Sequence, residues 1–261
     1  MKSLVFSLLL CLPIHADGWN PAPVPEIHSH NDYLQDKPLS GALAAGAGSI
    51  EVDVFLTDGE LLVAHMPWEL LKRRTLERLY VQPLRDHVKK TGEVPELQLL
   101  VDVKSKDADA AVTALEKVFG KHPEIFSNDG VRVVISGNRP ARKDFGKYAD
   151  FIWFDGRGPA EAAGPGGERV AIVSQSLSKF TRWRGKGEID EKERKAIVDF
   201  VAKCHKRDRP VRFWNSGDNP AMYEFICSVG ADFINTDKPD AVRAFLKQRA
   251  GAEPAGAAED E

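Results

Sequence analysis

The sequence of 261 residues contains little cysteine and no surplus of basic residues, and both absences exclude classes of protein. Of the three cysteines, Cys11 lies in the N-terminal apolar segment, and Cys204 and Cys227 could form at most one disulfide. We favour two separate core thiols. Lys and Arg total 36 against 39 Asp and Glu, which gives a net charge of −3. Since nucleic acid binding needs a basic surface, we expect no nucleic acid partner.

The sequence also lacks an apolar run long enough to cross a membrane as a helix. Near the N-terminus, Lys2 precedes a short apolar segment from Leu4 to Ile14, and the small residue Ala16 follows. This pattern is typical of a secretory signal peptide. We therefore expect residues 1–16 to be removed and the mature protein to be secreted or periplasmic.

Two segments rich in small residues carry no signal for a folded element. The stretch GRGPAEAAGPGGE (156–168) has glycines but no following Lys-Ser/Thr pair, so it is a loop and not a phosphate-binding P-loop. The last residues are small, acidic and without periodicity. We expect residues 251–261 to form a disordered tail.

Apolar runs of strand length recur eight times, separated by helical patterns or polar loops. The helical pattern that starts at Asp190 places four apolar residues on one stripe, namely Ile197, Val198, Val201 and Cys204. Another helical pattern starts at Asp107. This alternation, with no internal linker, predicts one domain over residues 17–250, folded as a single (β/α)₈ TIM barrel. The expected strands lie within residues 26–32, 49–58, 96–105, 131–138, 151–157, 169–176, 210–216 and 232–239.

The second expected strand alternates apolar residues with acids. Side chains two apart on a strand share a face, so Glu51 and Asp53 point to one side. The other side holds Ile50, Val52 and Val54. Because the outer face of a barrel packs against helices, we expect both carboxylates to point into the barrel.

The first and third expected strands direct ionisable residues inward by the same alternation. His28 and His30 share the inner face of the first strand, and Asp102 and Lys104 that of the third. A lone histidine is usually structural, and we expect His28 to be structural or to support a ligand.

The three inward acids suggest a metal site. Buried carboxylates are costly unless a cation compensates them, and three acids outnumber one lysine. We therefore expect a divalent cation held by Glu51, Asp53 and Asp102. Ligation by oxygen alone suits Mg²⁺ or Ca²⁺ better than zinc. For either of the first two acids alone, a solvated position at a strand end is the alternative.

Two further histidine and lysine positions suggest catalysis near this cation. His30 and His65 lie near the C-terminal ends of a strand or hairpin, where barrel enzymes keep their active sites. Imidazoles beside a cation can act as general acid and base. Lys104 would meet an anion such as a phosphate oxygen, or form a salt bridge with Asp102 or Glu51.

Other residues at the ends of later strands are weaker candidates. Trp214 would line a substrate pocket or pack as a core tryptophan, and Asn138 would line the pocket or cap a loop. The segment 179–186 would contact a membrane surface or an anionic substrate, or simply face water. It combines four basic residues with two aromatic ones, namely Lys179, Arg182, Arg184 and Lys186 with Phe180 and Trp183.

The motifs HSHNDY, IEVDV, LLVAH and LLVDVK resemble, in order and spacing, the glycerophosphodiester phosphodiesterase and phosphatidylinositol-phospholipase-C-like superfamily. Within it, HNDY, PLSGAL, LYVQPL and NTDKP are most similar to the altered-inheritance-of-mitochondria protein 6-like group. The resemblance implies a TIM barrel that hydrolyses phosphodiesters with a bound metal. It assigns His30 and His65 to catalysis and Lys104 to the phosphate. The implied metal ligands are Glu51, Asp53 and Asp102.

The sequence departs from the superfamily pattern at two positions. Asn31 stands where typical glycerophosphodiesterases have arginine, and no acid directly follows His65. We assign Asn31, with Lys104, to phosphate binding. The substrate stays open between glycerophosphodiesters, phosphoinositides, other lipid headgroups and polymer-derived diesters.

We therefore predict a secreted, metal-dependent phosphoric diester hydrolase that acts on a small-molecule or lipid-derived phosphodiester. Two alternatives stay open. One is a zinc amidohydrolase-like barrel with His28 and His30 on the metal, although no histidine lies between His122 and His205. The other is a secreted binding barrel without catalysis. The sequence does not indicate the oligomeric state.

Overall fold

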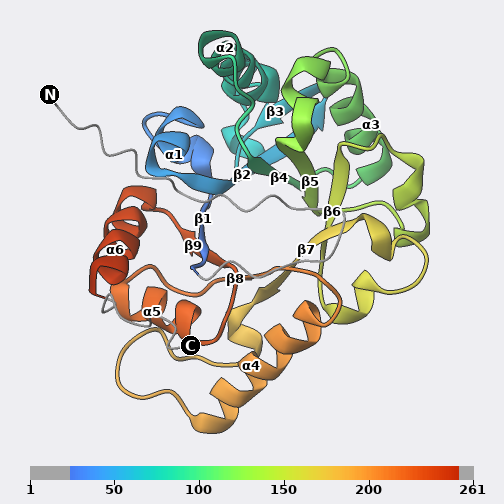
Figure 1. Cartoon of the computed structure of the whole chain (residues 1–261). Helices are drawn as coiled ribbons and strands as arrows, with labels where there is room; N and C mark the ends of the chain where they lie inside the picture. Colours follow the sequence, from blue (N-terminus) through green and yellow to red (C-terminus); the bar gives the residue numbers. More distant parts are fainter. Residues whose placement is uncertain (1–23, 253–261) are drawn as a thin grey trace, which may run out of the picture.

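Residues 24–252, which the computed structural model describes, form a closed barrel of eight parallel strands with helices around it (Figure 1). Each barrel strand pairs in parallel with the next, and pairing of β1 with β2 closes the ring. The predicted (β/α)₈ barrel is confirmed. The strands are β1 (Glu26–Ser29), β2 (Ala47–Thr57), β4 (Leu97–Val103), β5 (Val131–Gly137), β6 (Ile152–Gly156), β7 (Val170–Ser176), β8 (Val211–Trp214) and β9 (Phe233–Thr236). The predicted signal peptide lies outside the described residues.

A ninth strand, β3 (Glu60–Val63), pairs antiparallel with β2 and makes a hairpin above the barrel rim. The turn consists of Asp58 and Gly59, whose φ angles are 51° and 82°. Asp-Gly is the sequence that favours a tight hairpin turn with two positive φ angles. Val63 lies opposite Val54, so the chain returns to the level of Asp53 just before His65.

Six α-helices cover the barrel or fill its loops in the described part of the chain. The Asp107 carboxylate accepts a hydrogen bond from the Ala110 amide, and that of Asp190 accepts bonds at the start of the next long helix. These caps satisfy amides that have no partner within a helix, which explains the two predicted helix starts. The helices are α1 (Ser40–Ala45), α2 (Gln82–Thr91), α3 (Ala108–Phe119), α4 (Glu191–His205), α5 (Pro220–Ser228) and α6 (Pro239–Ala252).

The structure corrects two details of the prediction. Val198 is 38% exposed, whereas the other three members of the predicted stripe on α4 are buried. Positions 197, 201 and 204 follow helical spacing, and Val198 lies about 100° around the helix from Ile197. Helix α6 extends to Ala252, so the predicted tail begins too early, and residues 253–261 lie outside the described part.

The two cysteines are unpaired, as predicted. Cys204 is buried in the core, and Cys227 is partly buried and packs against it. Burial raises the pKa of the Cys204 thiol to about 12. This thiol is therefore protonated and inert at neutral pH.

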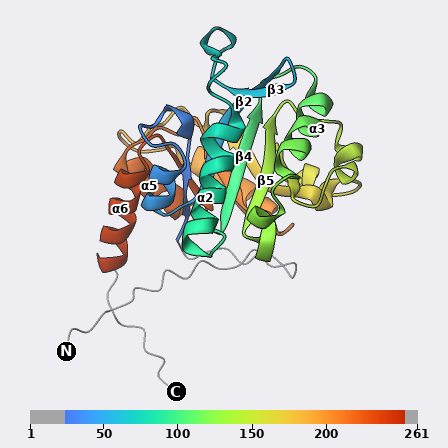
Figure 2. The same ribbon diagram turned by 90° about the horizontal axis from the view of Figure 1, so that it is seen from above.

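The barrel wall separates an apolar outer layer from an interior that combines polar residues with a small apolar cluster of Val134, Ile172 and Phe233. The outward-facing apolar residues at the centre of β2 and β4 are fully buried beneath the helices, as their alternation predicts. The strands run toward one end of the barrel, and Figure 2 shows the segment after β3 projecting beyond that end. The outer residues are Ile50, Val52 and Val54 on β2 and Val101 and Val103 on β4.

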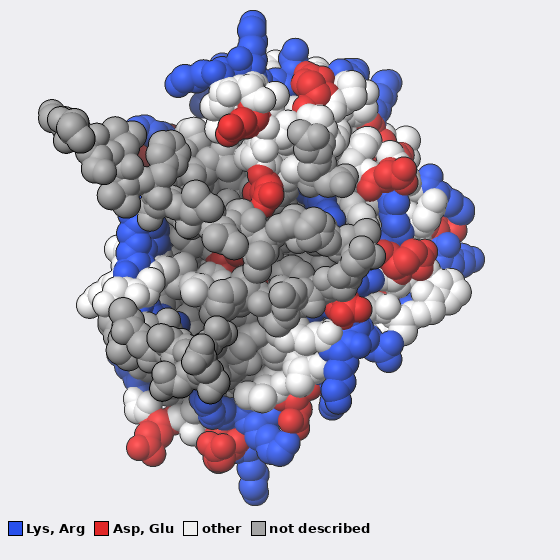
Figure 3. Space-filling view, viewed as in Figure 1, with Lys and Arg blue, Asp and Glu red and all other residues white. Residues whose placement is uncertain are grey.

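The surface of the described residues mixes both signs of charge. On the face shown in Figure 3, Lys and Arg side chains alternate with Asp and Glu around the rim. No helix within residues 24–252 combines the length and the hydropathy needed to cross a bilayer.

Candidate active site

Three carboxylates meet at the C-terminal ends of neighbouring barrel strands. Glu51 and Asp53 come from β2 and Asp102 from β4, and one ligand atom of each lies within 4.8 Å of the others. Asp53 is paired in register with Asp102 across the two parallel strands. Alternation along one strand and register between two strands thus bring together the predicted ligand set.

Asp53 has one crowded and one unpartnered oxygen. Its Oδ2 accepts from the Tyr33 hydroxyl at 2.9 Å and lies 2.9 Å from His65 Nδ1 and 3.1 Å from Lys104 Nζ. Its Oδ1 is buried and has no hydrogen-bond partner among the described residues. Burial raises the pKa of Asp53, and the positive charge of Lys104 only partly opposes this. An unpaired buried oxygen in an acidic cluster fits a cation ligand.

Arg212 on β8 forms a buried ion pair with Glu51. Its guanidinium contacts both Glu51 and His28, and it also donates to Ser174 Oγ at 3.1 Å. Burial alone would raise the pKa of Glu51, but the charge of Arg212 and the hydrogen bond from His28 hold it well below its usual range. Glu51 is therefore ionised even without a metal.

His28 is a support for Glu51 and not a metal ligand in this arrangement. Its Nε2 lies 2.8 Å from Glu51 Oε2, and its Nδ1 lies 2.7 Å from Ser49 Oγ. Burial and the nearby charge of Arg212 lower the pKa of His28 to about 3, so the ring is neutral. Both ring nitrogens are engaged, which leaves none for the zinc site of an amidohydrolase-like barrel.

Lys104 forms the expected salt bridge with Asp102, at 3.1 Å. Its second partner is Asp53, also at 3.1 Å, and not Glu51, because Asp53 is the residue in register with Asp102. Burial would lower the pKa of Lys104, but the two carboxylates outweigh it and raise the pKa. The ammonium group is therefore charged and partly exposed at the barrel mouth.

The two predicted catalytic histidines are each oriented by a carboxylate. His30 Nδ1 lies 2.7 Å from Asp237 Oδ1, and His65 Nδ1 lies 2.9 Å from Asp53 Oδ2. Because an ionised carboxylate only accepts hydrogen bonds, each Nδ1 carries the proton. Neither Nε2 has a hydrogen-bond partner within residues 24–252, and both side chains are partly exposed. Each Nε2 is thus available to a substrate.

The weaker candidates occupy different places. Asn31 has a φ of 45°, and its side-chain amide lies 3.2 Å from the Tyr33 hydroxyl, whose one proton is donated to Asp53. Trp214 is exposed at the end of β8, so it is not a core tryptophan. Asn138 is exposed and donates to the backbone oxygens of Lys104 and Ser105, so it ties down a loop.

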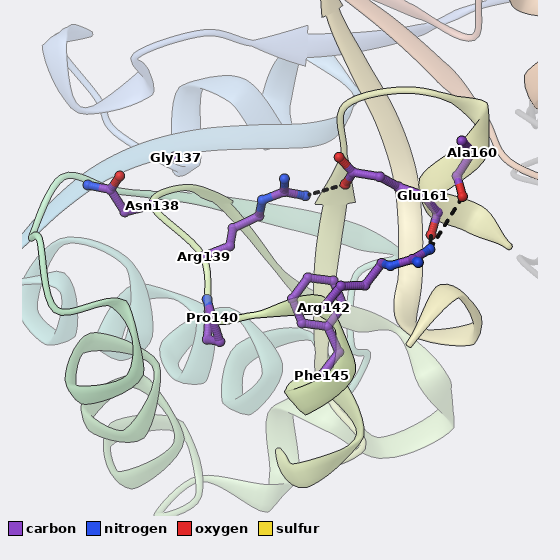
Figure 4. A pocket seen from close by; sticks show the side chains of 8 residues that line it. All are labelled: Gly137, Asn138, Arg139, Pro140, Arg142, Phe145, Ala160 and Glu161. Carbon is purple, nitrogen blue, oxygen red and sulfur yellow. Dashed lines mark hydrogen bonds and ion pairs between the residues drawn. The ribbon is translucent and has the colours of Figure 1, made fainter. Parts of the chain in front are cut away.

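Asn138 also lines a separate cavity of about 430 Å³ between the loops that follow β5 and β6 (Figure 4). Two arginines cross this cavity. Arg139 is paired with Glu161 at 3.0 Å, and Arg142 donates to backbone oxygens of the facing loop, including that of Ala160. Their guanidinium groups are thus already engaged, and the cavity lacks the acids and histidines of the barrel mouth.

The chain is similar to known phosphodiesterase sequences and structures. Residues 20–108 match the family described as the AIM6-like phosphodiesterase domain, and this range includes nearly all of the site. The chain is similar to the AIM6-like phosphodiesterases. The altered inheritance of mitochondria protein 6 of Eremothecium gossypii is 26% identical over 84% of this chain and 69% of that protein. These matches confirm the resemblance expected from the motifs.

Solved structures share the barrel. A glycerophosphodiester phosphodiesterase from Parabacteroides distasonis superposes with a TM-score of 0.57 at 19% identity, covering 87% of this chain and 98% of that one. An Oleispira antarctica phosphodiesterase, solved with the product sn-glycerol-3-phosphate, gives a TM-score of 0.54 at 15% identity over 86% and 97% of the two chains. At such identities the likeness shows the fold. Fold and family match together support a phosphodiester hydrolase.

The candidate site contains three residues that the sequence analysis did not single out. Arg212 alternates with the outward Val211 and Phe213 on its strand, so the alternation rule points it inward. Tyr33 and Asp237 stand within the motifs HNDY and NTDKP that carry the family resemblance. The available signals were thus strand alternation for one residue and motif membership for the other two.

Proposed function

We propose that this AIM6-like chain is a metal-dependent phosphoric diester hydrolase in which His30 and His65 serve as general acid and base. The observation that carries the proposal is the cluster of three carboxylates within 4.8 Å, in which a buried Asp53 oxygen has no partner. His65 and Lys104 both contact Asp53, so the proton-transfer and phosphate-binding groups adjoin the cluster.

The donor set fits a divalent cation of the oxygen-preferring kind. Glu51, Asp53 and Asp102 would hold Mg²⁺ or Ca²⁺, since the cluster consists of carboxylates alone. When bound, such an ion supplies Lewis-acid polarisation of the phosphoryl oxygens. Arg212 already compensates the negative charge of Glu51, one of the three carboxylates.

Lys104 prepares the barrel mouth for a phosphate group. Two carboxylates hold its ammonium group in place, and the raised pKa keeps it charged. A fixed positive charge stabilises the negative charge that gathers on the phosphoryl oxygens in the transition state. Asn31, held in a left-handed conformation, would add an uncharged amide where an arginine is usual in the superfamily.

The two histidines would move the protons. A hydroxyl of the substrate or of water loses its proton to one Nε2, and the leaving alcohol receives a proton from the other. Asp237 fixes the ring of His30, and Asp53 fixes that of His65, so both rings present Nε2. Trp214 would contact the substrate from the end of β8.

We further propose that the mature protein acts outside the cytoplasm, on a small-molecule or lipid-derived phosphodiester. The apolar segment near the N-terminus supports this location. A binding barrel without catalysis is the second candidate, and it is favoured by Asn31, which stands where the superfamily usually has arginine.

Hydrolysis of bis(p-nitrophenyl) phosphate and of a panel of natural diesters, with Mg²⁺ or Ca²⁺, tests the function. His30→Ala and His65→Ala should each lower turnover by roughly 10²- to 10⁴-fold with circular dichroism unchanged. His87→Ala, on helix α2, is the matched control and should retain full turnover. Full turnover in both active-site variants would remove the acid and base assignment, and no turnover by the wild type on any diester would favour the binding barrel.

A further inference from the structure

The loop that follows His65 exposes an unusual set of large apolar side chains. Trp68 is 78% exposed, and Leu71 and Met66 are 43% and 38% exposed. None of them belongs to the core clusters formed by the described residues. We call residues 66–73 the rim loop. Singly exposed apolar residues are common, but three in one loop with a tryptophan foremost indicate a contact surface.

The rim loop is held in this exposed form by its base. The amide of Val63 donates to the Arg74 oxygen at 2.8 Å, and the Arg74 side chain donates to the Tyr33 oxygen at 2.6 Å. Inside the loop, the Glu69 carboxylate accepts from the amides of His65 and Met66. The exposure of Trp68 thus results from an ordered turn closed at both ends.

The position of the rim loop ties it to the barrel mouth. The loop begins directly after His65, whose ring contacts Asp53 in the carboxylate cluster. Figure 2 shows this segment projecting beyond the ends of β2 and β4. Whatever covers the rim loop therefore lies beside the opening through which a substrate enters.

Two positive charges accompany the apolar residues. Lys72 and Arg73 are exposed, and neither forms an ion pair with any residue in the described range. Tryptophan and leucine next to unpaired basic residues form the combination that binds the interface of an anionic lipid layer. We propose that the rim loop docks the barrel mouth onto an anionic lipid surface, so that the active site takes its phosphodiester from a lipid headgroup. This inference rests on the proposed function for its substrate, but not for the docking itself.

A lipid surface explains the arrangement better than a protein partner. A protein seated permanently on the rim loop would stand beside His65 and obstruct the mouth, whereas a bilayer brings the substrate to that point. The complementary charge also favours anionic lipid, because the basic pair directly follows the apolar residues in sequence.

The segment 179–186, the other basic and aromatic segment, is less suited to this role. Its two aromatic rings face inward: Phe180 packs against Phe213, and Trp183 packs against Phe225. Arg184 donates to nearby backbone oxygens of its own loop. The side chains that this segment exposes are therefore charged and not aromatic. The double variant Lys179→Gln/Lys186→Gln, which removes two exposed charges, is a matched control for Lys72→Gln/Arg73→Gln in the rim loop.

Co-sedimentation of the purified chain with vesicles tests the docking. The wild type should bind vesicles of phosphatidylcholine and phosphatidylserine more strongly than phosphatidylcholine alone. Trp68→Ala should lower the partition coefficient by about tenfold or more, since most of the indole is available for burial. Lys72→Gln/Arg73→Gln should lower the partition coefficient on anionic vesicles about fivefold for each charge removed. On vesicles of phosphatidylcholine alone it should have no effect. Val198→Ser and the control pair in segment 179–186 should change little.

Turnover of soluble bis(p-nitrophenyl) phosphate separates docking from catalysis, and Trp68→Ala should leave it unchanged. Wild-type chain that fails to bind anionic vesicles at low salt would overturn the proposal, and so would equal loss in the controls. If Trp68→Ala alters the oligomeric state and not vesicle binding, the rim loop is a contact between copies and the lipid proposal is wrong. Vesicle binding that depends on Trp68 in a chain without any hydrolysis would uphold docking and reject the phosphodiesterase.

Discussion

Removing Arg212 should destabilise the protein strongly, because Glu51 would then be a buried charge without compensation. Arg212 is 3% exposed and Glu51 is 5% exposed, and the guanidinium also donates to Ser174 and Asn235. Removal of one partner from a buried ion pair costs about 3–5 kcal/mol. For a domain of this size, that corresponds to a melting temperature lower by roughly 6–20 °C. We expect both changes in Arg212→Met.

Urea unfolding in a chelating buffer, followed by circular dichroism, measures this effect. Arg85→Met is the matched control, because its pair with Glu124 is exposed and such pairs contribute about 0.2–1 kcal/mol. The double variant Glu51→Gln/Arg212→Met should be more stable than Arg212→Met alone, since the uncompensated charge is gone. Added Mg²⁺ or Ca²⁺ should stabilise Arg212→Met more than the wild type, because an ion would restore positive charge beside Glu51.

The pH dependence supplies an independent check. The pKa of Glu51 is depressed in the folded protein, so its contribution to stability is present above the ordinary value of 4.5 and is lost as the pH falls below it. The difference in the free energy of unfolding between the wild type and Arg212→Met should therefore become smaller at acidic pH. If Arg212→Met lowers the free energy of unfolding by less than 1 kcal/mol at pH 7, the reasoning is wrong. It is also wrong if the double variant is no more stable than Arg212→Met.

Three further changes have expected outcomes. Asp237→Asn should lower kcat on the order of tenfold or more, because the His30 ring loses the carboxylate that orients it. The melting temperature should not change, because the Asp237 side chain is exposed. An unchanged kcat would contradict this prediction. Burial and the charges of Glu96 and Asp232 raise the pKa of Glu26 to about 6, so its contribution to stability is present below pH 4.5 and lost as the pH rises through 6. Glu26→Gln should thus raise the free energy of unfolding at pH 7 by up to about 2 kcal/mol and leave it unchanged at pH 4. Urea unfolding at pH 7 and at pH 4 measures this difference. An equal effect of the substitution at both pH values would contradict the prediction. Gly137→Ala should weaken divalent cation binding in calorimetry, because Gly137 has a φ of 66° and an added Cβ would overlap the Asp102 carboxylate; unaltered affinity would exclude that contact.

The barrel and its acidic cluster were predictable because both depend on alternation. A period of two fixes which side of β2 faces inward, and the parallel order of strands then places Asp53 beside Asp102. The same rule applied to Arg212 would have predicted its inward direction. Its pairing with Glu51 was not predictable from local sequence, since it depends on how strands separated by 161 residues meet across the closed barrel.

Side-chain exposure in loops was less predictable than strand direction. Tryptophan is usually well buried, so nothing in the stretch MPWELLKRR indicated that Trp68 would be the most exposed large apolar residue of the described chain. The opposite happened in segment 179–186, where Phe180 and Trp183 turn into the core. Loop conformation depends on turns and distant hydrogen bonds, which periodicity does not report.

The most direct test of the central claim is the rate of bis(p-nitrophenyl) phosphate hydrolysis by protein stripped with a chelator and then titrated with Mg²⁺ or Ca²⁺. Asp53→Asn, which keeps the size of the side chain but weakens the cluster, is measured beside it. We expect no turnover after chelation, saturable recovery in the wild type and none in Asp53→Asn. Turnover that survives chelation, or equal recovery in the variant, would contradict the claim that these carboxylates hold a cation required for phosphodiester hydrolysis.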